Sequence, residues 1–209
     1  MTAEDSSIEA LGALADPVRR ALYRHVAEAP EEVGRDAAAE AAGVSRSLAA
    51  FHLDKLVDAG LLAASYRRPA GRGGPGAGRP AKVYRRADAE FAVALPPREY
   101  GAAGRLLAEV VERAGLDREL QAAARAAGEQ EQAPDLPEAL RGRGYAPFLD
   151  GEVLRLRNCP FHALADEFPA LVCGMNLALL AGLAGEGWTA AMDPCAGGCC
   201  VSLSKNNKD

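Results

Sequence analysis

The stretch AAEAAGVSRSLAAFHLDKLVDAGLL (Ala38–Leu62) decides the fold of the N-terminal part of the chain. An alanine-rich helix is expected over Arg35–Ala42, and Gly43 provides the turn after it. Ser45 has the side-chain oxygen that caps a following helix, which is expected over Arg46–Ala59. Two helices joined by such a tight turn are typical of a helix-turn-helix.

The flanking segments complete a larger pattern. Apolar residues over positions 11–26 recur at three- and four-residue spacing, and Asp16, placed before a proline, divides this region into two helices. Strands are expected over Leu61–Arg68 and Ala81–Ala87, on either side of a glycine- and proline-rich segment at 69–80. Helix, helix, turn, helix and hairpin is the order of a winged helix-turn-helix.

The charge distribution favours DNA binding by the hairpin. The whole chain has 24 basic and 29 acidic residues, a net charge of −5, which gives no overall indication of nucleic-acid binding. Residues 61–87 nevertheless contain no acidic residue, and their basic residues are Arg67, Arg68, Arg72, Arg79, Lys82, Arg85 and Arg86. This local basic ribbon is what a DNA-binding wing requires.

These motifs resemble the ArsR/DeoR-type winged-helix repressors. The family pattern Leu-Ala-Asp-Pro-x-Arg is present from Leu14 to Arg19, and Val-Ser followed by His-Leu, Leu and Ala-Gly-Leu is present from Val44 to Leu61. The resemblance covers residues 8–87 and implies a repressor that binds a double-stranded DNA operator. A homodimer is expected, because one winged helix reads too few base pairs to define a specific site.

The recognition helix has an outward side that is expected to enter the major groove. The predicted DNA contacts are Ser45, Arg46, Ser47, Ala50 and Phe51 on this helix, and Arg67, Arg68, Arg72, Arg79 and Lys82 on the wing. The inward side is expected to consist of Leu48, His52, Leu53, Leu56 and Val57. Arg46 is the candidate for a bidentate contact with guanine, while the wing arginines are expected to contact phosphates or reach into a minor groove. His52 is expected to be a packed structural residue.

The expected fold is α+β in three parts: a winged helix-turn-helix (1–95), a helical linker or dimerisation region (96–134) and a C-terminal sensor domain (135–209). The middle part contains helices at Gly101–Ala114 and Asp117–Glu131; the first has an apolar stripe that must be buried against something. In the last part, helices are expected at Leu136–Arg143 and Pro169–Ala184, and strands within Tyr145–Arg157, Trp188–Met192 and Cys199–Leu203.

All five cysteines lie in the last quarter of the chain: Cys159, Cys173, Cys195, Cys199 and Cys200. An odd number in a reducing compartment argues against a disulfide framework. Pro160 at a first helical position is expected to place Cys159 at a helix N-terminus, which favours the thiolate. On a strand, Cys199 and Cys200 would point to opposite faces, so only one of them is expected to reach a common site. The predicted ligands are therefore Cys159, Cys173, Cys195 and one of Cys199 and Cys200, with His162 as an alternative.

The segments CPFHALADEFPALVCGMNLALL and DPCAGGCCVSL resemble the C-terminal sensor of SufR-type iron–sulfur regulators. The resemblance covers residues 145–203 and implies a 4Fe-4S or 2Fe-2S cluster on which DNA binding depends. The spacing of the last three cysteines departs from the family pattern. Zinc, a thiol redox switch and inert structural cysteines therefore remain as alternatives.

The sequence gives little support to other functions. There is no CxxC motif, and the glycines around Gly76 lie between expected strands rather than at the start of a helix, so no nucleotide-binding loop is predicted. An enzyme and a small-molecule substrate are therefore not expected. The N-terminus has no signal-peptide pattern, and no apolar run is expected to approach the ~20 residues that span a bilayer. We expect a cytoplasmic protein with no membrane partner.

Overall fold

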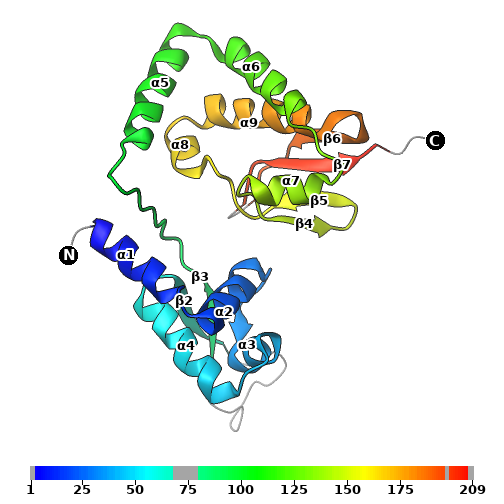
Figure 1. Ribbon diagram of the computed structural model, residues 1–209. Helices are drawn as coiled ribbons and strands as arrows, with labels where there is room; N and C mark the ends of the chain where they lie inside the picture. The colour runs from blue at the N-terminus through cyan, green and yellow to red at the C-terminus, as the bar shows by residue number, and fades with distance from the viewer. Residues whose placement is uncertain (1–2, 68–79, 196–197, 207–209) are drawn as a thin grey trace. The chain divides into compact units, whose positions relative to one another are not determined.

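The computed structural model describes residues 3–67, 80–195 and 198–206, and the chain divides into two compact units, Met1–Arg98 and Glu99–Asp209 (Figure 1). The helices expected in the middle of the chain belong to the second unit, together with the cysteines. The division into three parts stays a prediction. The α+β fold class is confirmed, with a helix-turn-helix and small hairpin wing, a helical region and a C-terminal antiparallel sheet.

The first unit has the predicted order of helices and strands. Its elements are α1 (Ala3–Ala13), α2 (Pro17–Glu28), β1 (Val33–Gly34), α3 (Arg35–Ala42), α4 (Arg46–Asp58), β2 (Leu62–Arg67) and β3 (Ala81–Arg86). The strands form an antiparallel sheet in the order β1-β3-β2, in which the wing strands pair from Leu62 opposite Arg86 to Arg67 opposite Ala81. The two-residue strand β1 was not predicted, because it is too short to show a periodic pattern.

Local capping determines where the helices of this unit begin. The Asp16 side chain accepts a hydrogen bond of 2.9 Å from the backbone N–H of Arg19, with Pro17 at the first helical position. The Ser45 hydroxyl accepts one of 3.3 Å from Leu48, and Gly43 between α3 and α4 has a φ of 64°, the left-handed region that favours glycine. These contacts confirm the predicted starts of α2 and α4.

The core of the first unit forms where α2, α3 and α4 meet the sheet. Its fully buried large side chains include Leu22, Leu53, Leu56 and Tyr84. Burial of one leucine side chain is worth about 1.5–3 kcal/mol, so these residues provide much of the stability of the unit. His52 is also buried, as predicted.

The expectation that Leu48 points inward is wrong. Its side chain is 41% exposed, and Ala49 is the residue that is fully buried instead. Successive helical residues are rotated by about 100°, and the buried stripe of α4 runs through Ala49, Leu53 and Leu56. Leu48 lies one such rotation away from the stripe, on the outer surface of the helix.

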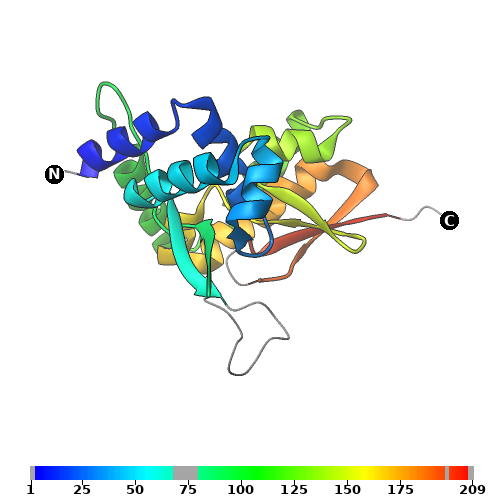
Figure 2. The same ribbon diagram turned by 90° about the horizontal axis from the view of Figure 1, so that it is seen from below.

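The second unit places helices around a four-stranded sheet. Its elements are α5 (Tyr100–Ala114), α6 (Asp117–Gln130), α7 (Leu136–Gly142), β4 (Pro147–Asp150), β5 (Val153–Leu156), α8 (His162–Glu167), α9 (Pro169–Ala184), η1 (Gly185–Gly187), β6 (Trp188–Met192) and β7 (Val201–Lys205). The strands are antiparallel in the order β4-β5-β7-β6, with the last strand of the chain inside the sheet (Figures 1 and 2).

Helices α6 and α9 lie side by side and approach closely at glycines (Figure 1). A Cβ atom on Gly128 would collide with the backbone carbonyl of Leu179, and one on Gly182 would collide with that of Arg125. The side-chain amide of Gln132 donates a hydrogen bond of 2.9 Å to the Gly182 carbonyl. The contact between the two helices therefore requires glycine at both positions.

Helix α9 is more apolar than the sequence reasoning allowed. Together with η1, it forms the segment Pro169–Gly187, which is long and apolar enough to cross a membrane by length and composition only, with a mean hydropathy of 1.5. The expectation that no apolar run approaches this length is wrong, because no charged residue interrupts α9. In the second unit α9 packs against α6 and β6, where Leu171, Leu180 and Leu183 are buried.

Candidate nucleic-acid interface and cysteine cluster

The N-terminal end of α4 presents an exposed mixed surface. Arg46, Ser47 and Phe51 are exposed, whereas Ala50 is half-buried. The hydroxyls of Ser45 and Ser47 lie 3.2 Å apart, so both oxygens are at the start of the helix. Guanidinium, hydroxyl and aromatic groups at one helix end are suited to contacts with base edges and phosphates in a major groove.

Arg46 has an intramolecular partner at this surface. Its Nε lies 2.6 Å from Oδ1 of Asp36, which joins the recognition helix to α3. Both side chains are well exposed, at 66% and 79%, and exposed ion pairs contribute little net stability. The pair can therefore open without disturbing the core.

Leu48 and Phe51 add an apolar component that sequence reasoning only half identified. Their side chains are 41% and 56% exposed, respectively. Exposed apolar groups on a recognition helix are suited to contact with the methyl group of thymine. Leu48 was missed because leucine is usually a core residue; its position relative to the Leu53–Leu56 stripe is the signal that would have found it.

Lys82 of the predicted wing contacts is held inside the first unit. Its ammonium lies 2.7 Å from Oδ1 of Asp54, while the Arg35 guanidinium lies 3.2 Å from Oδ2. The Tyr84 hydroxyl donates a further hydrogen bond of 2.8 Å to Asp54. Burial alone would raise the pKa of Asp54, but the hydrogen bonds from Lys82 and Tyr84 and the charges of Lys82 and Arg35 outweigh it, so the pKa is lowered.

The other predicted wing residues divide into two groups. Arg67 is 63% exposed and lies 3.9 Å from the carboxylate of Glu32, which also accepts a hydrogen bond of 2.6 Å from Ser65. Arg68, Arg72 and Arg79 lie outside the described residues. The tertiary structure therefore brings Glu32 and Asp54 to a ribbon that contains no acid in sequence.

Four of the five cysteine thiols lie together in the second unit. The Sγ atoms of Cys173 and Cys200 are 2.9 Å apart. Cys199 forms a hydrogen bond with Cys159, and Cys200 and Cys173 lie close enough to Cys159 to act on its pKa. The four sulfurs come from three places: the loop before α8, helix α9 and the residues just before β7. We call these four residues the cysteine cluster.

Cys199 and Cys200 lie beside different thiols, Cys159 and Cys173 respectively, and the expectation that only one of the two reaches a common site stays a prediction. That expectation rested on a strand beginning at Cys199, whereas β7 begins at Val201. Side chains alternate between faces only within a strand, so the rule does not apply to these two residues. Which of the cysteines bind a metal stays a prediction.

Cys159 is not at the start of a helix. Helix α8 begins at His162, and Pro160 lies in the turn before it. The hydrogen bond from Cys199 lowers the pKa of the Cys159 thiol, and the backbone N–H of Phe161 lowers it further against the effect of burial. The predicted preference for the thiolate therefore has these hydrogen bonds as its cause, rather than a helix terminus.

Two buried polar side chains form a chain of hydrogen bonds that ends at the cysteine cluster. The Asn176 amide donates a hydrogen bond of 3.2 Å to Sγ of Cys199, and its oxygen accepts one of 2.5 Å from the Tyr145 hydroxyl. Both Asn176 and Tyr145 are almost fully buried, and burial raises the pKa of Tyr145. Sequence reasoning missed this pair, although an asparagine within the apolar α9 was the available signal.

Two other thiols of the cysteine cluster have raised pKa values. The hydrogen bond to Cys159 and burial raise the pKa of Cys199. Burial and the hydrogen bond to Cys200 raise the pKa of Cys173 to about 12. Cys199 and Cys173 thus ionise less readily than an ordinary thiol, in contrast to Cys159.

Cys195 and His162 have other neighbours. The Cys195 thiol lies 3.7 Å from the carbonyl oxygen of Cys199. The Arg155 guanidinium, on β5, lies 2.9 Å from the carboxylate of Asp193, two residues before Cys195. The His162 side chain is 71% exposed and lies 3.6 Å from Asp166.

The cysteine cluster has the donor atoms of a thiolate metal site, but its sulfurs are not spaced as the ligands of one metal ion are. Within 3–67, 80–195 and 198–206, no three His, Cys, Asp or Glu side chains are arranged to hold one metal ion. Zinc–sulfur bonds of about 2.3 Å in a tetrahedron place ligand sulfurs about 3.8 Å apart. Cys173 and Cys200, at 2.9 Å, would have to separate to bind one ion. The residues fit in kind and number, and binding would require their sulfurs to rearrange.

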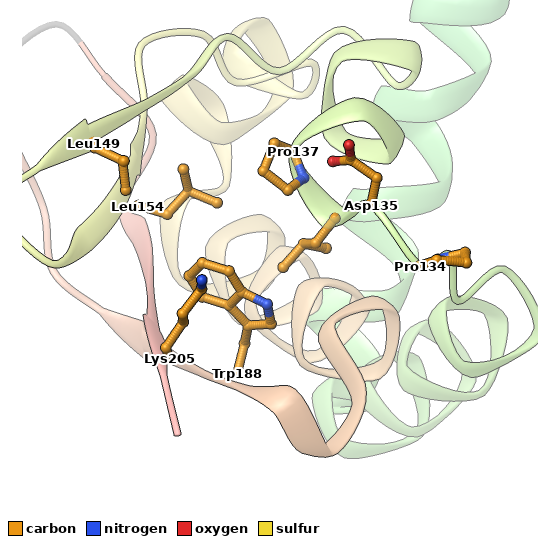
Figure 3. Close-up of a pocket in the computed structure, with 8 residues that line it drawn as sticks. Pro134, Asp135, Pro137, Leu149, Leu154, Trp188 and Lys205 are labelled. Carbon is orange, nitrogen blue, oxygen red and sulfur yellow. The ribbon is translucent and has the colours of Figure 1, made fainter. Parts of the chain in front are cut away.

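A separate cavity of about 410 Å³ lies in the second unit (Figure 3). Its described lining is Pro134, Asp135, Leu136, Pro137, Leu149, Leu154, Trp188 and Lys205. The Lys205 ammonium lies 5.4 Å from the ring centre of Trp188, and the Asp135 carboxylate caps α7 through the N–H of Glu138. Both charged groups are thus engaged with neighbouring groups at this mostly apolar surface.

Comparisons with known proteins support the first unit. A family model described as a helix-turn-helix domain matches residues 14–63, which is less than half of the chain. No curated protein and no solved structure is significantly similar to the chain. The matched region begins just after α1, runs through α4 to the start of β2, and includes the whole recognition helix. The chain therefore carries a helix-turn-helix DNA-binding domain, as transcriptional regulators do.

Proposed function

We propose that the protein is a cytoplasmic, homodimeric transcriptional repressor that responds to iron–sulfur or redox status through the cysteine cluster. The observation that carries the proposal is the gathering of four thiols from three chain segments, in a chain that also has a DNA-binding domain. Five cysteines within residues 159–200, and none before them, also favour a dedicated site. The proposal assigns the chain no catalytic reaction and no small-molecule substrate.

The DNA-binding step rests on α4. Its exposed end would enter the major groove of a double-stranded operator, with Arg46 on a guanine and the serines on phosphates or base edges. Two copies would occupy half-sites about one helical turn apart. Operator binding measured at two salt concentrations tests this step, because phosphate contacts by wing arginines make affinity fall steeply with salt.

The homodimer is supported by an unpartnered stripe on α5. The stripe consists of Tyr100, Ala103, Leu106, Leu107, Val110 and Ala114, and all six side chains are exposed. Leu106 and Leu107 are 65% and 67% exposed, a costly arrangement for leucine in water. Residues at these three- and four-residue spacings form one apolar helix face without a charge, which is the surface that pairs with its own copy in a two-fold dimer.

A substitution within the apolar stripe, compared with one elsewhere on α5, tests whether the stripe is the dimer interface. We expect Leu107→Lys to convert the dimer into a monomer, measured by size-exclusion chromatography with light scattering. Glu112→Lys introduces the same side chain on the same helix outside the stripe and should leave the dimer intact. A wild-type monomer, or a Leu107→Lys dimer of unchanged stability, would show that α5 is not the interface.

We propose an iron–sulfur cluster as the group that the cysteine cluster binds, with Cys159, Cys173, Cys199 and Cys200 as its ligands. Thiolates are the ligands of such clusters, and Cys159 has a lowered pKa and thus the greatest readiness to ionise. A bound cluster supplies one-electron redox chemistry and sensitivity to oxidants. Its loss would free the loop before β7, which is how the state of the cluster would reach the fold of the second unit.

Zinc is the second candidate, and the spacing of the thiols favours it. The 2.9 Å separation of Cys173 and Cys200 is nearer to the about 3.8 Å between sulfurs on one zinc ion than to the wider spacing of ligands on different irons. Zinc has no redox chemistry, so the site would then be structural or zinc-responsive.

Purification without oxygen separates the two candidates. An iron–sulfur protein would be brown, contain iron and sulfide, and bleach in air, whereas a colourless protein with stoichiometric zinc would overturn the cluster proposal. Cys159→Ser should abolish binding of either group. A Cys195→Ser control should retain it, because Cys195 lies against the Cys199 carbonyl rather than in the cysteine cluster.

A further inference from the structure

We infer that Cys173 and Cys200 form a redox-active dithiol, which a small-molecule disulfide such as oxidised glutathione converts to an intramolecular disulfide. The two Sγ atoms are 2.9 Å apart. Both residues are half-buried, so a small oxidant has access to them. They lie 27 positions apart in the chain, so the disulfide would join two separate elements of the unit.

Little movement is needed to form the bond. A disulfide has an S–S distance of about 2.05 Å, so the sulfurs must approach by about 0.9 Å. Cys173 is fixed in the second turn of α9, whereas Cys200 lies before β7, outside any helix or strand. Rotation of the Cys200 side chain can therefore supply the approach while the helix stays in place.

The other thiols have competing partners. Cys199 accepts a hydrogen bond from the buried amide of Asn176 and also bonds to Cys159. Cys195 lies against a backbone carbonyl. Pairing either of them with Cys173 would break these contacts, whereas joining Cys173 to Cys200 replaces only the contact between the two sulfurs.

The oxidation is a pair of thiol–disulfide exchanges. The sulfur of one cysteine attacks a sulfur of the small disulfide, forms a mixed disulfide and releases one small thiol. The second cysteine then attacks the protein sulfur of the mixed disulfide, closes the Cys173–Cys200 bond and releases the second small thiol. Two cysteine thiols lose two electrons and two protons, which the two released small thiols carry.

This disulfide would also compete with metal binding, and that consequence rests on the proposed function. It removes two of the four sulfurs of the cysteine cluster, and a disulfide sulfur is not a thiolate ligand. Oxidised protein would therefore lose the capacity to bind iron–sulfur or zinc until a reductant restores both thiols. Formation of the disulfide in the metal-free protein does not depend on that proposal.

The test maps the disulfide in the full-length, metal-free protein after incubation with oxidised glutathione. All five cysteines lie between Arg157 and Lys205, with no lysine or arginine between these two, so trypsin leaves them on one peptide. Additional cleavage after Glu167 and Glu186 separates Cys159, Cys173 and the last three cysteines into different fragments. Free thiols are blocked with maleimide before digestion, so that exchange during handling is prevented.

We expect a disulfide between the fragment of Cys173 and the last fragment, with Cys159 free and labelled. The link should persist in Cys195→Ser and disappear in Cys200→Ser. A link that persists in Cys200→Ser, a link to the fragment of Cys159, or no link at all would overturn the inference. Fragmentation of the wild-type peptide between residues 199 and 200 makes the same assignment if Cys200→Ser does not fold.

Zinc uptake before and after oxidation separates this inference from the proposed function. Loss of zinc uptake on oxidation and recovery with a reductant support both. A mapped Cys173–Cys200 disulfide with unchanged uptake would overturn the proposed ligand set and leave the dithiol standing. Zinc uptake by a protein that forms no disulfide would overturn the dithiol and leave the metal site standing.

Discussion

In the first unit, α4 begins where Ser45 caps it, and its buried stripe of Ala49, Leu53 and Leu56 follows the helical repeat. In the second unit, α9 takes its position from a distant helix, because Gly182 accommodates the backbone of α6 at Arg125. The first arrangement depends on neighbours in sequence, and the second depends on residues more than fifty positions apart. Substitutions in α4 should therefore act mainly through contacts with residues near in sequence, whereas substitutions in α9 should act through its contact with α6.

The largest effect is expected from the helix contact of the second unit. Gly182→Ala places a Cβ against the Arg125 carbonyl, and overpacking against backbone should lower the free energy of unfolding by about 3 kcal/mol. Gly104→Ala is the matched control, since a Cβ there meets no atom of the described structure within 4 Å. It should be neutral or stabilise α5 by about 0.5–1 kcal/mol. Equal effects of both substitutions in thermal or urea unfolding would contradict the close helix contact.

The next effect concerns DNA recognition by the first unit. Arg46→Ala should weaken specific operator binding by about 10- to 100-fold, the loss of one bidentate base contact worth about 1–3 kcal/mol. Nonspecific DNA should lose much less affinity. Lys55→Ala removes a cation from the other end of α4 and serves as the control. If Arg46→Ala weakens all sequences equally in titrations, Arg46 contacts phosphate rather than a base.

A smaller, pH-dependent effect is expected at the Asp54 network. Since the pKa of Asp54 is lowered in the folded state, its stabilisation is complete above the ordinary carboxyl pKa of about 4 and is lost as the pH falls below that value. Asp54→Asn should therefore reduce stability at pH 7 by no more than about 1 kcal/mol, because Asp54 is partly exposed and solvent screens its ion pairs.

The comparison for Asp54 lies on the same helix. Asp58 pairs with exposed Lys55 at 3.4 Å, so Asp58→Asn should change stability less than Asp54→Asn. Urea unfolding of both variants at pH 7 and pH 3 provides the measurement. A difference between wild type and Asp54→Asn that is as large at pH 3 as at pH 7 would refute the linkage.

The smallest effect concerns the ion pair that holds Arg46. Asp36→Ala should release the guanidinium and remove a negative charge near the phosphates, tightening operator binding by up to about fivefold, in line with an exposed pair worth less than about 1 kcal/mol. Glu40→Ala removes the same charge farther along α3. Equal gains from both variants in the same titration would indicate a general charge effect and no competition by Asp36.

The helix-turn-helix could be predicted because its signals are short. A capping serine, a proline after Asp16 and a glycine turn each act within a few residues, so one sequence is enough to place the helices. The same reasoning placed Leu48 inside, because it weighed the residue type above its angle on the helix. The partners of the wing residues could not be predicted, since Asp54 and Lys82 meet only when α4 packs beside β3.

The contacts within the cysteine cluster could be predicted from the sequence even less well than those of the wing. The clustering of cysteines at the end of the chain, and the place of Cys173 in the second turn of α9, were available from sequence. Which thiol faces which was not, because it depends on where β7 begins and on the turn before α8. Asn176 became a partner of Cys199 only through the packing of α9 beneath these residues.

The sequence by itself determined the DNA-binding module and the concentration of thiols, since both follow from residue types at short spacing. The tertiary structure alone decided that Cys199 meets Cys159 and that Cys173 meets Cys200. It also decided that Glu32 and Asp54 hold residues of the basic wing. The physical reason is the same in each case: hydrogen bonds and ion pairs act over a few ångströms in space, and only packing brings residues that are distant in sequence within that range.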